Sequence, residues 1–186
     1  MDPFAALVGV LLAERALEFI LAERNRRWAR SRGGQESGQR HYPIIVGMHA
    51  LFYASLVLER YSLSRGWTPL WPVWLALLAL GQGLRVWAIA SLGRFWNTRI
   101  IVIPGLRPVT RGPYRFIRHP NYLVVAIEVF VVPVLCGAYL TALVFSAANA
   151  VVLHIRIREE EQALLRAAGA DLRALPRFIP GRRRSS

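Results

Sequence analysis

Two polar clusters flank an apolar stretch late in the chain, and their residue types could bind a charged small molecule. The first reads RGPYRFIRHPNY over residues 111–122, and the second reads RIREEEQAL over residues 156–164. Together they supply phenols, an imidazole, guanidinium groups and carboxylates, which donate and accept hydrogen bonds and carry both signs of charge. Polar side chains at the ends of membrane-length segments are costly to keep there and usually mark a site. The two clusters therefore form the candidate functional site.

The first cluster is expected to begin a helix. Pro120 suits the first helical turn, where its missing N–H would be unpaired in any case, and it favours an extended backbone at His119. Asn121 and Tyr122 follow in a turn whose free N–H groups favour an anionic group of a ligand. The alternative is a purely structural helix start at a membrane interface, with Tyr114 and Tyr122 among the aromatic residues that gather there.

The second cluster is expected to continue the last apolar helix out of the membrane. Arg156 and Glu160 are four residues apart and share one helix face, whereas Glu159 and Glu161 are expected to point elsewhere. An arginine there could hold a substrate anion through its fork of donors, and a glutamate could accept from hydroxyl or amino groups. The alternative for Arg156 and Glu160 is a solvated salt bridge along the helix.

The composition indicates a membrane protein. The chain has 186 residues, of which 54% are hydrophobic, and its mean hydropathy is +0.33. The formal net charge is +13, and all 24 basic residues are arginines. Nucleic acid is not the expected partner, because most of these arginines lie between apolar segments, as in the loops of membrane proteins. The single cysteine, Cys136, excludes a disulfide framework and a paired-cysteine metal site, and we expect no metal.

Five apolar segments predict an all-α, polytopic membrane protein with about five transmembrane helices. The segments are residues 3–22, 43–60, 69–92, 120–135 and 138–157. A bilayer core of roughly 30 Å needs about 20 helical residues, and the fourth segment is short of that length at 1.5 Å per residue. Because only Cys136 and Gly137 separate the last two segments, we expect a helical hairpin, with a bend near Pro133.

The distribution of arginine predicts the orientation of these helices. Residues 23–42 and 93–118 carry six arginines each, whereas the loop at 61–68 carries only Arg65. Since basic loops stay on the cytoplasmic side, we expect the N-terminus outside, the C-terminus in the cytoplasm and both polar clusters facing the cytoplasm. The chain is interpreted as a single domain with three parts, which are a three-helix membrane part at 1–92, a catalytic part at 93–168 and a basic cytoplasmic tail at 169–186.

Charged residues also lie inside the predicted membrane helices. Glu14, Arg15 and Glu18 occupy the first helix, Arg85 the third and Glu128 the fourth. Mutual pairing that keeps the helices in register is one interpretation, and a polar lining for a substrate cavity is the other.

The two clusters and their spacing resemble the isoprenylcysteine carboxyl methyltransferase family of integral membrane enzymes. The resemblance covers about residues 94–164 and rests on LRPVTRGPYRFIRHPNY, an apolar hairpin and RIREEEQAL. It implies an O-methyltransferase that uses S-adenosylmethionine as its cofactor. It also implies which residues contact that cofactor, namely Leu106, Arg107, Pro108, Val109, Tyr114, His119, Pro120, Asn121, Tyr122 and Glu160. Arg156 would be the catalytic residue that binds the group being methylated.

The longer stretch GRFWNTRIIVIPGLRPV resembles a bacterial branch of that family, whose members methylate alkylpyrone or alkylresorcinol lipids. The loop at 95–105 departs from the eukaryotic pattern, which disfavours a prenylated cysteine as the substrate. The resemblance implies a lipid-tailed acceptor, methylated on a carboxylate or a hydroxyl group, and a multi-pass enzyme of the bacterial inner membrane. It leaves the oligomeric state open.

The sequence alone also allows two other functions. Membrane sterol and steroid reductases carry a run similar to RHPNY and use it to hold NADPH, although their chains are usually longer and are not associated with the RI-x-x-EE segment. A non-catalytic membrane scaffold is the alternative from another class. Protection of the protein by S-adenosylhomocysteine, by NADP or by neither would separate the three.

Overall fold

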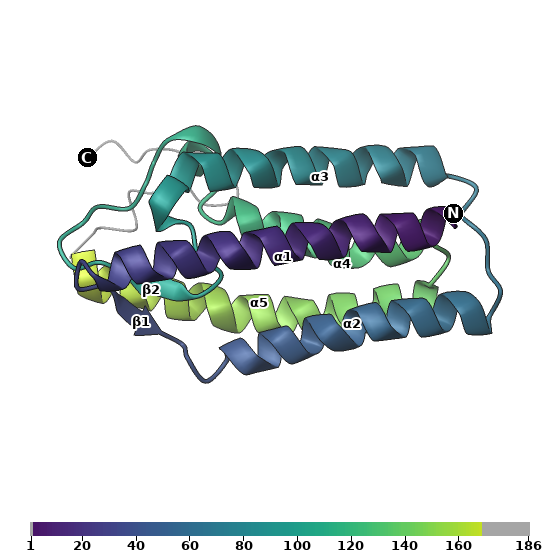
Figure 1. The fold of residues 1–186 in the computed structure, drawn as a ribbon, viewed down its shortest axis with the longest axis horizontal. Coiled ribbons are helices and arrows are strands. Elements are labelled where there is room, and N and C mark those ends of the chain that lie inside the picture. The colour runs from purple at the N-terminus through teal and green to yellow at the C-terminus, as the bar shows by residue number, and fades with distance from the viewer. Residues whose placement is uncertain (1, 169–186) are drawn as a thin grey trace, which may run out of the picture.

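Five helices lie side by side in an elongated bundle (Figure 1). The structure is a computed structural model that describes residues 2–168, so the predicted basic tail at 169–186 lies outside the described residues. The helices are α1 (Pro3–Arg30), α2 (Tyr42–Ser62), α3 (Trp71–Leu92), α4 (Pro120–Leu135) and α5 (Tyr139–Ala168). The protein is therefore mostly helical, as predicted, and α4 has the predicted bounds.

Three of the described helices are long and apolar enough to cross a membrane, namely Tyr42–Ser62, Trp71–Phe95 and Tyr139–Ala167. Helix α4 is apolar but shorter. Helix α1 continues to Arg30, well beyond the apolar segment predicted at 3–22. Residues 23–30 are rich in charge but still form helix. Hydropathy finds only the part of a helix that suits lipid, whereas the backbone hydrogen bonds continue past it.

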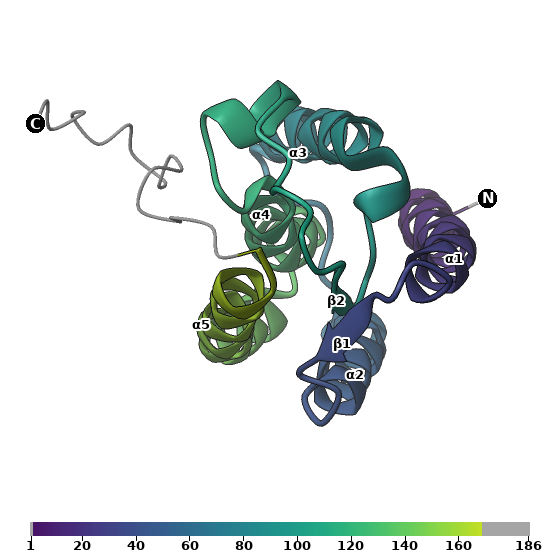
Figure 2. The ribbon, with the colours of Figure 1, turned by 90° about the vertical axis from the view of Figure 1, so that its left-hand side faces the viewer.

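The loops at one end of the bundle contain two short strands that the sequence did not predict (Figure 2). Strand β1 (Gln35–Ser37) pairs antiparallel with β2 (Ile100–Val102). Between the strands and the bundle, Glu36 accepts hydrogen bonds from Arg30 at 2.9 Å and from Arg99 at 2.6 Å. Burial alone would raise the pKa of Glu36, but the bonds from Arg99 and Arg30 outweigh it and lower that pKa. Strands of three residues are too short to give a readable alternation of polar and apolar residues.

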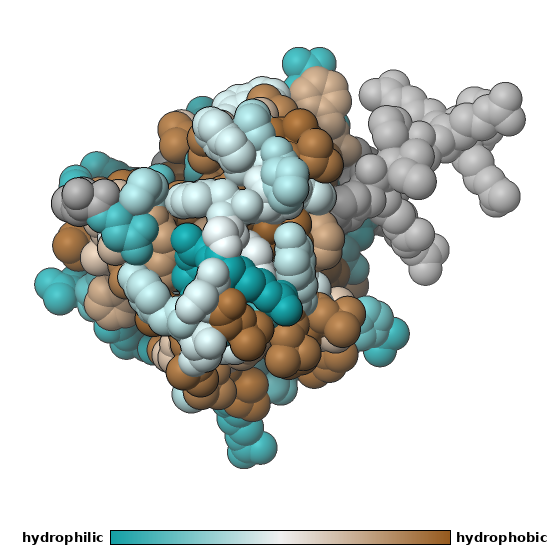
Figure 3. All heavy atoms as spheres, turned by 90° about the vertical axis from the view of Figure 1, so that its right-hand side faces the viewer, coloured by the Kyte–Doolittle hydropathy of each residue, from teal (hydrophilic) through white to brown (hydrophobic). Residues whose placement is uncertain are grey.

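The apolar core lies at the other end of the bundle. Phe4 of α1, Leu56 of α2 and Leu135 of α4 are each at most 1% exposed and belong to one cluster of buried side chains. Figure 3 views the molecule from this end, where hydrophobic residues also remain at the surface around the edge of the bundle. Such exposed apolar side chains suit a lipid environment.

The predicted hairpin joins α4 and α5 near this core. Gly137 has φ +76°, and a Cβ there would lie 2.7 Å from the carbonyl oxygen of Gly66, so the turn requires glycine. The first turn of α5 is capped from another helix, because the Glu59 carboxylate accepts from the backbone N–H of Thr141 at 2.7 Å and from its hydroxyl at 2.7 Å. The hairpin is thereby held against α2.

The charged residues in the middle of the bundle pair with one another. Arg85, which is 3% exposed, donates to Glu18 at 3.2 Å and also bonds Glu128. Arg15 forms an ion pair with Glu18 at 2.8 Å. These contacts join α1, α3 and α4, which agrees with pairing that keeps the helices in register. They also turn the charges of α1 toward the interior of the bundle.

Candidate active site

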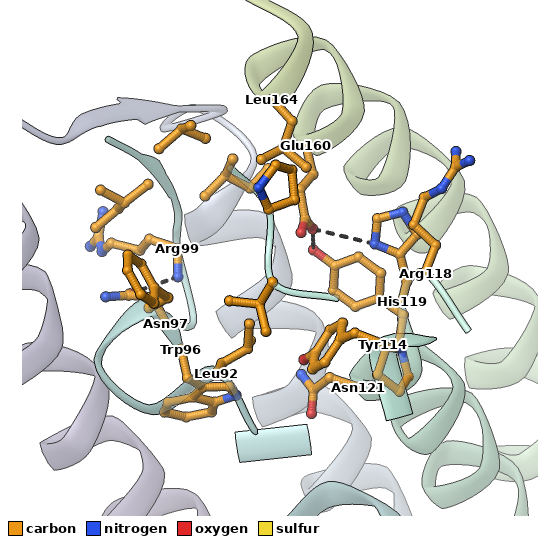
Figure 4. Close-up of a pocket in the computed structure, with 18 of the residues that line it drawn as sticks. Leu92, Trp96, Asn97, Arg99, Tyr114, Arg118, His119, Asn121, Glu160 and Leu164 are labelled. Carbon is orange, nitrogen blue, oxygen red and sulfur yellow. Dashed lines mark hydrogen bonds and ion pairs between the residues drawn. The ribbon is translucent and has the colours of Figure 1, made fainter. Parts of the chain in front are cut away.

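One pocket brings together all the residues that the sequence predicted for the site (Figure 4). The segments that form it are the end of α3 with the turn after it, strand β2, the loop that follows, the turn η2 (Gly112–Arg115), the start of α4 and the outer part of α5. The predicted residues among its lining are Leu106, Arg107, Pro108, Val109, Tyr114, His119, Pro120, Asn121, Tyr122, Arg156 and Glu160. They come from segments up to 54 residues apart in the chain (106 to 160), so the fold is what assembles the pocket.

Tyr122 connects α4 to α5 at the centre of the site. Its hydroxyl donates to the Glu160 carboxylate and accepts from Arg156 Nε at 2.9 Å. Arg156 Nη2 also donates to the carbonyl oxygen of Thr98, in the segment before β2. Arg156 and Glu160 do share one face of α5, as predicted, but both bond Tyr122 instead of pairing with each other. The alternative of a solvated salt bridge between them therefore does not describe this site.

His119 lies between the aromatic ring of Tyr122 and two carboxylates of α5. Its ring stacks on Tyr122, with centroids 5.3 Å apart and an interplanar angle of 18°. His119 Nε2 is 3.3 Å from Glu161 Oε1, and Nδ1 is 3.8 Å from Glu160 Oε2. Arg118 Nη1 also donates to Glu161 Oε1, at 2.5 Å. The imidazole is 7% exposed, so this network fixes a nearly buried ring.

Glu161 does not line the pocket and lies off the face that Arg156 and Glu160 share, as predicted, but it bonds two residues that line the pocket. Helix spacing correctly separates it from Glu160, because neighbouring residues lie about 100° apart around the helix axis. The start of α4, however, contacts both of these glutamates. Residues 118–119 bond Glu161, and Tyr122 bonds Glu160. The spacing of residues along one helix predicts which of them share a face, but not how many of its faces the neighbouring helix contacts.

Asn121 and Trp96, which line the pocket, each carry a buried polar atom that has no hydrogen-bond partner among residues 2–168. These atoms are the side-chain oxygen of Asn121 and the indole Nε1 of Trp96. Trp96 is 2% exposed, and its indole lies along one wall of the pocket (Figure 4). Buried polar groups are almost always paired in folded proteins, so this acceptor and this donor are available to a ligand that enters the pocket.

Trp96 was not among the predicted site residues. It follows the turn η1 (Gly93–Phe95), which is held against α1 by Asn25. The buried Asn25 side chain donates to the carbonyl oxygens of Gly93 at 3.2 Å and Trp96 at 2.8 Å. The neighbouring Asn97 donates to the carbonyl oxygen of Ala22 at 3.0 Å. The polar residue Asn25 near the end of an apolar helix was the available signal, but its partners are about 70 residues away.

Tyr114 enters the pocket from a turn that lies tightly on α3. Gly112 has φ +61°, and a Cβ there would lie 1.9 Å from the Ser91 hydroxyl oxygen, so only glycine fits. Arg111 Nε donates to the carbonyl oxygen of Ser91 at 2.9 Å. Burial, with a smaller contribution from the charge of Glu160, raises the pKa of Tyr114. Its phenol is therefore neutral at ordinary pH and is available as a hydrogen-bond donor.

The loop that carries residues 106–109 is bonded to the end of α5. The Gly105 N–H donates to the carbonyl oxygen of Ala167 at 3.1 Å, and Gly105 itself has φ +78°. Leu106 is 43% exposed and Phe95, which also lines the pocket, is 46% exposed, so both present apolar surface at the edge of the pocket. The pocket thus combines a charged and aromatic interior with an apolar edge, which suits a polar group attached to a hydrocarbon chain.

Similarity to known proteins agrees with this geometry. A family model described as the isoprenylcysteine carboxyl methyltransferase (ICMT) family matches residues 74–166, half of the chain. The chain belongs to the ICMT family. Every residue that lines the pocket, from Leu92 to Leu164, falls inside the matched region. Membership indicates a membrane methyltransferase, and methyltransferases of the ICMT family generally use S-adenosylmethionine.

Two relatives extend the similarity beyond the matched region. A Bacillus subtilis (strain 168) protein, "Uncharacterized protein YpbQ", is 41% identical over 161 residues, which cover 87% of this chain and 96% of that protein. A Haemophilus influenzae protein, "Uncharacterized protein", is 24% identical over 155 residues, which cover 83% of this chain and 90% of that protein. No solved structure matches the chain. The similarity to the first relative therefore includes α1 or α2 as well as the ICMT region.

Proposed function

We propose that the chain is an S-adenosylmethionine-dependent O-methyltransferase that methylates a lipid-tailed acceptor at the membrane. The observation that carries this proposal is the pocket itself. Tyr114, His119, Asn121, Tyr122 and Glu160 converge there from three segments, inside the region that matches the ICMT family. A sterol-type reductase would share the RHPNY run, but the family match favours methyl transfer.

The residues of the pocket fit this cofactor. When bound, S-adenosylmethionine supplies an electrophilic methyl group on a positively charged sulfur and also carries an amino group, a carboxylate and an adenine. The unpaired Asn121 oxygen can accept from an amino group, and the unpaired Trp96 N–H can donate to a carboxylate or a ring nitrogen. The Glu160 carboxylate and the aromatic ring of Tyr114 favour positive charge. Leu106, Arg107, Pro108 and Val109 would complete the site from the loop.

Arg156 would bind the group that is methylated. Its Nε and Nη2 already bond Tyr122 and Thr98, so the guanidinium is held in place before any ligand arrives. A carboxylate acceptor is already anionic and needs orientation and loss of water more than a base. A hydroxyl acceptor must first lose its proton, and the positive charge of Arg156 favours the resulting oxyanion.

The acceptor would enter from the bilayer with its hydrocarbon tail left in lipid. Exposed Phe95 and Leu106 form the apolar edge of the pocket and would contact that tail next to the polar head. This arrangement explains why a pocket with buried charges opens beside side chains that avoid water. It applies equally to a prenylated carboxylate and to a long-chain phenol or enol.

The proposed topology has five membrane helices, the N-terminus outside and the active site in the cytoplasm of a bacterial cell. Inward pairing of Glu18 with Arg85 leaves apolar Leu17, Phe19 and Ile20 exposed on α1, which supports α1 as a membrane helix. The proposed division is a membrane part at 1–92, a catalytic part at 93–168 and a basic tail at 169–186. A reporter fused at Arg65 or Gly137 should appear outside the cell, and one at Arg32 or Arg107 inside. A loop at 93–118 found outside would contradict the cytoplasmic site.

Ligand binding followed by product identification tests the proposed activity. The purified protein in detergent is titrated with S-adenosylhomocysteine and with NADP, and we expect heat of binding with the first alone. The protein is then incubated with labelled S-adenosylmethionine and a lipid extract, and mass spectrometry should find label in an ester or ether of a long-chain lipid. Binding of NADP would contradict methyl transfer and favour a reductase. Binding of neither ligand would favour a non-catalytic scaffold.

A further inference from the structure

A second pocket lies outside the candidate active site, as a groove between α1 and the end of α3. Its α1 side is formed by Leu21, Arg24, Asn25 and Trp28, and its other side by Ile89, Ala90, Gly93 and Arg94. The proposed methyl transfer uses none of these side chains. The groove lies where the candidate membrane helix Trp71–Phe95 ends, which is the depth of lipid headgroups.

Three hydrogen-bond donors in this groove lack an acceptor. Within residues 2–168, Arg24 is exposed and makes no hydrogen bond or ion pair, and Arg94 likewise makes none but lies over the Trp28 ring, 5.9 Å from its centroid. The Trp28 Nε1 is buried and has no hydrogen-bond partner in the same part of the chain. The acid nearest in sequence, Glu23, is already paired with Arg26 at 2.7 Å and with Arg27 at 3.1 Å. The groove therefore concentrates positive charge and donors without a protein anion.

Apolar side chains continue the groove toward the centre of the bundle. On α1, residues 17, 21, 24 and 28 repeat at intervals of three and four and so follow one helix face. Leu17 is 68% exposed on that face, one turn before Leu21. On α3, Val86 is also 68% exposed, one turn before Ile89. Cations at one end and unpaired apolar surface on both helices match the shape and polarity of a phospholipid.

We propose that this groove binds an anionic phospholipid, with its phosphate between Arg24 and Arg94 and its acyl chains along Leu21 and Ile89. Guanidinium groups suit a phosphate because their planar donors match its oxygens in pairs. The Trp28 N–H supplies a further donor. Basic pockets between membrane helices are a recurrent way of holding such headgroups.

The bound lipid also stiffens one wall of the active site. Gly93 and Arg94 line the groove, whereas Leu92, Phe95 and Trp96 line the active-site pocket, so the short turn at 93–95 separates the two. A phosphate bonded to Arg94 restricts this turn from the side opposite the candidate active site.

Native mass spectrometry of the purified full chain tests the proposal. The probes are phosphatidylglycerol and phosphatidylcholine with identical acyl chains, because they differ in net charge but not in tail. Phosphatidylglycerol should stay bound under conditions that remove phosphatidylcholine. Replacing Arg24 or Arg94 by glutamine should weaken phosphatidylglycerol binding by about fivefold each, and the double variant by more than tenfold. Trp28→Phe, which keeps the ring but removes the N–H, should weaken it severalfold.

Arg40→Gln is the matched control. Arg40 is exposed, lies in the loop at the same end of the molecule and makes no bond within residues 2–168, but it does not line the groove. An equal loss of lipid in Arg40→Gln would mean general attraction to a basic surface and would overturn the proposal. Displacement of phosphatidylglycerol by millimolar inorganic phosphate, or equal retention of phosphatidylcholine, would also overturn it. The measurement needs no methyl transfer, so its outcome is independent of the proposed activity.

Discussion

The two ends of the helix bundle are built from different interactions, and the difference separates stability from function. At the end that contains Phe4, Leu56 and Leu135, the buried side chains are mostly apolar, and the hairpin turn is fixed by glycine and a cap from Glu59. At the opposite end several buried groups are polar, and the Trp96 indole N–H and the Asn121 side-chain oxygen belong to the pocket and have no partner within residues 2–168. The apolar end therefore serves mainly the fold, whereas the pocket at the polar end has a donor and an acceptor left for a ligand.

The largest effect is expected from a cavity at the apolar end. Leu56 is fully buried, so Leu56→Ala removes packed methyl groups and should lower the free energy of unfolding by about 2–5 kcal/mol. Leu58→Ala on the same helix, where Leu58 is 68% exposed, should change it by less than about 0.5 kcal/mol. Denaturant titration in detergent measures both. If the two ends are separate in function, Leu56→Ala should bind S-adenosylhomocysteine with unchanged affinity wherever it is folded, and a weakened affinity would contradict this.

The next largest effect is expected on cofactor binding at the polar end. His119→Ala and Glu160→Ala each remove hydrogen-bonding groups at a charged, partly buried site, which costs about 1.5–3 kcal/mol. Calorimetry should therefore find S-adenosylhomocysteine affinity reduced by roughly ten- to hundredfold, in protein that is still folded in detergent. Glu159→Ala is the control, since the neighbouring Glu159 does not line the pocket. Full affinity in both site variants would remove these residues from the cofactor site.

The same contrast explains what the sequence could and could not predict. Runs of apolar residues gave the helices, and the start of α4 was placed at Pro120 because proline marks a first turn. The residues of the two clusters meet in one pocket because α4 and α5 form a hairpin, which places the start of α4 beside the outer part of α5. A local sequence pattern is enough to predict a residue's position where that position depends on its own helix.

What the sequence missed depends on contacts between distant segments. Trp96 is buried because Asn25 holds its carbonyl oxygen from another helix, and no pattern within residues 93–99 indicates that bond. Glu161 faces His119 because α4 crosses α5 at that height. The strands at 35–37 and 100–102 pair with each other across a long stretch of chain, and Glu36 accepts from Arg99 beside them. Each miss is a pairing across the fold, which sequence spacing does not encode.

A smaller effect is expected on turnover, and it should distinguish a residue that binds the acceptor from residues that bind the cofactor. Arg156→Lys keeps the charge but loses the planar fork that bonds Tyr122 and Thr98 together, so the rate of methyl transfer should fall about tenfold or more. The affinity for S-adenosylhomocysteine should change little. Arg158→Lys serves as the control, because Arg158 is exposed on the same helix and does not line the pocket. A fully active Arg156→Lys would make the fork geometry irrelevant, and loss of cofactor binding would place Arg156 in the cofactor site.

The smallest effect concerns Trp96, the residue that most directly tests whether unpaired buried groups mark the functional end. Trp96→Phe keeps an aromatic ring but removes the N–H, whose net contribution as a neutral hydrogen bond is about 0.5–1.5 kcal/mol. S-adenosylhomocysteine affinity should therefore fall about two- to tenfold. Trp96 is 2% exposed, so the smaller phenyl ring leaves a cavity and should lower stability, although loss of the N–H, unpaired within residues 2–168, relieves the cost of an unsatisfied donor. Trp71→Phe, at the apolar end of α3, should alter neither quantity. Unchanged S-adenosylhomocysteine affinity in folded Trp96→Phe would mean that the free donor of the indole does not mark a ligand.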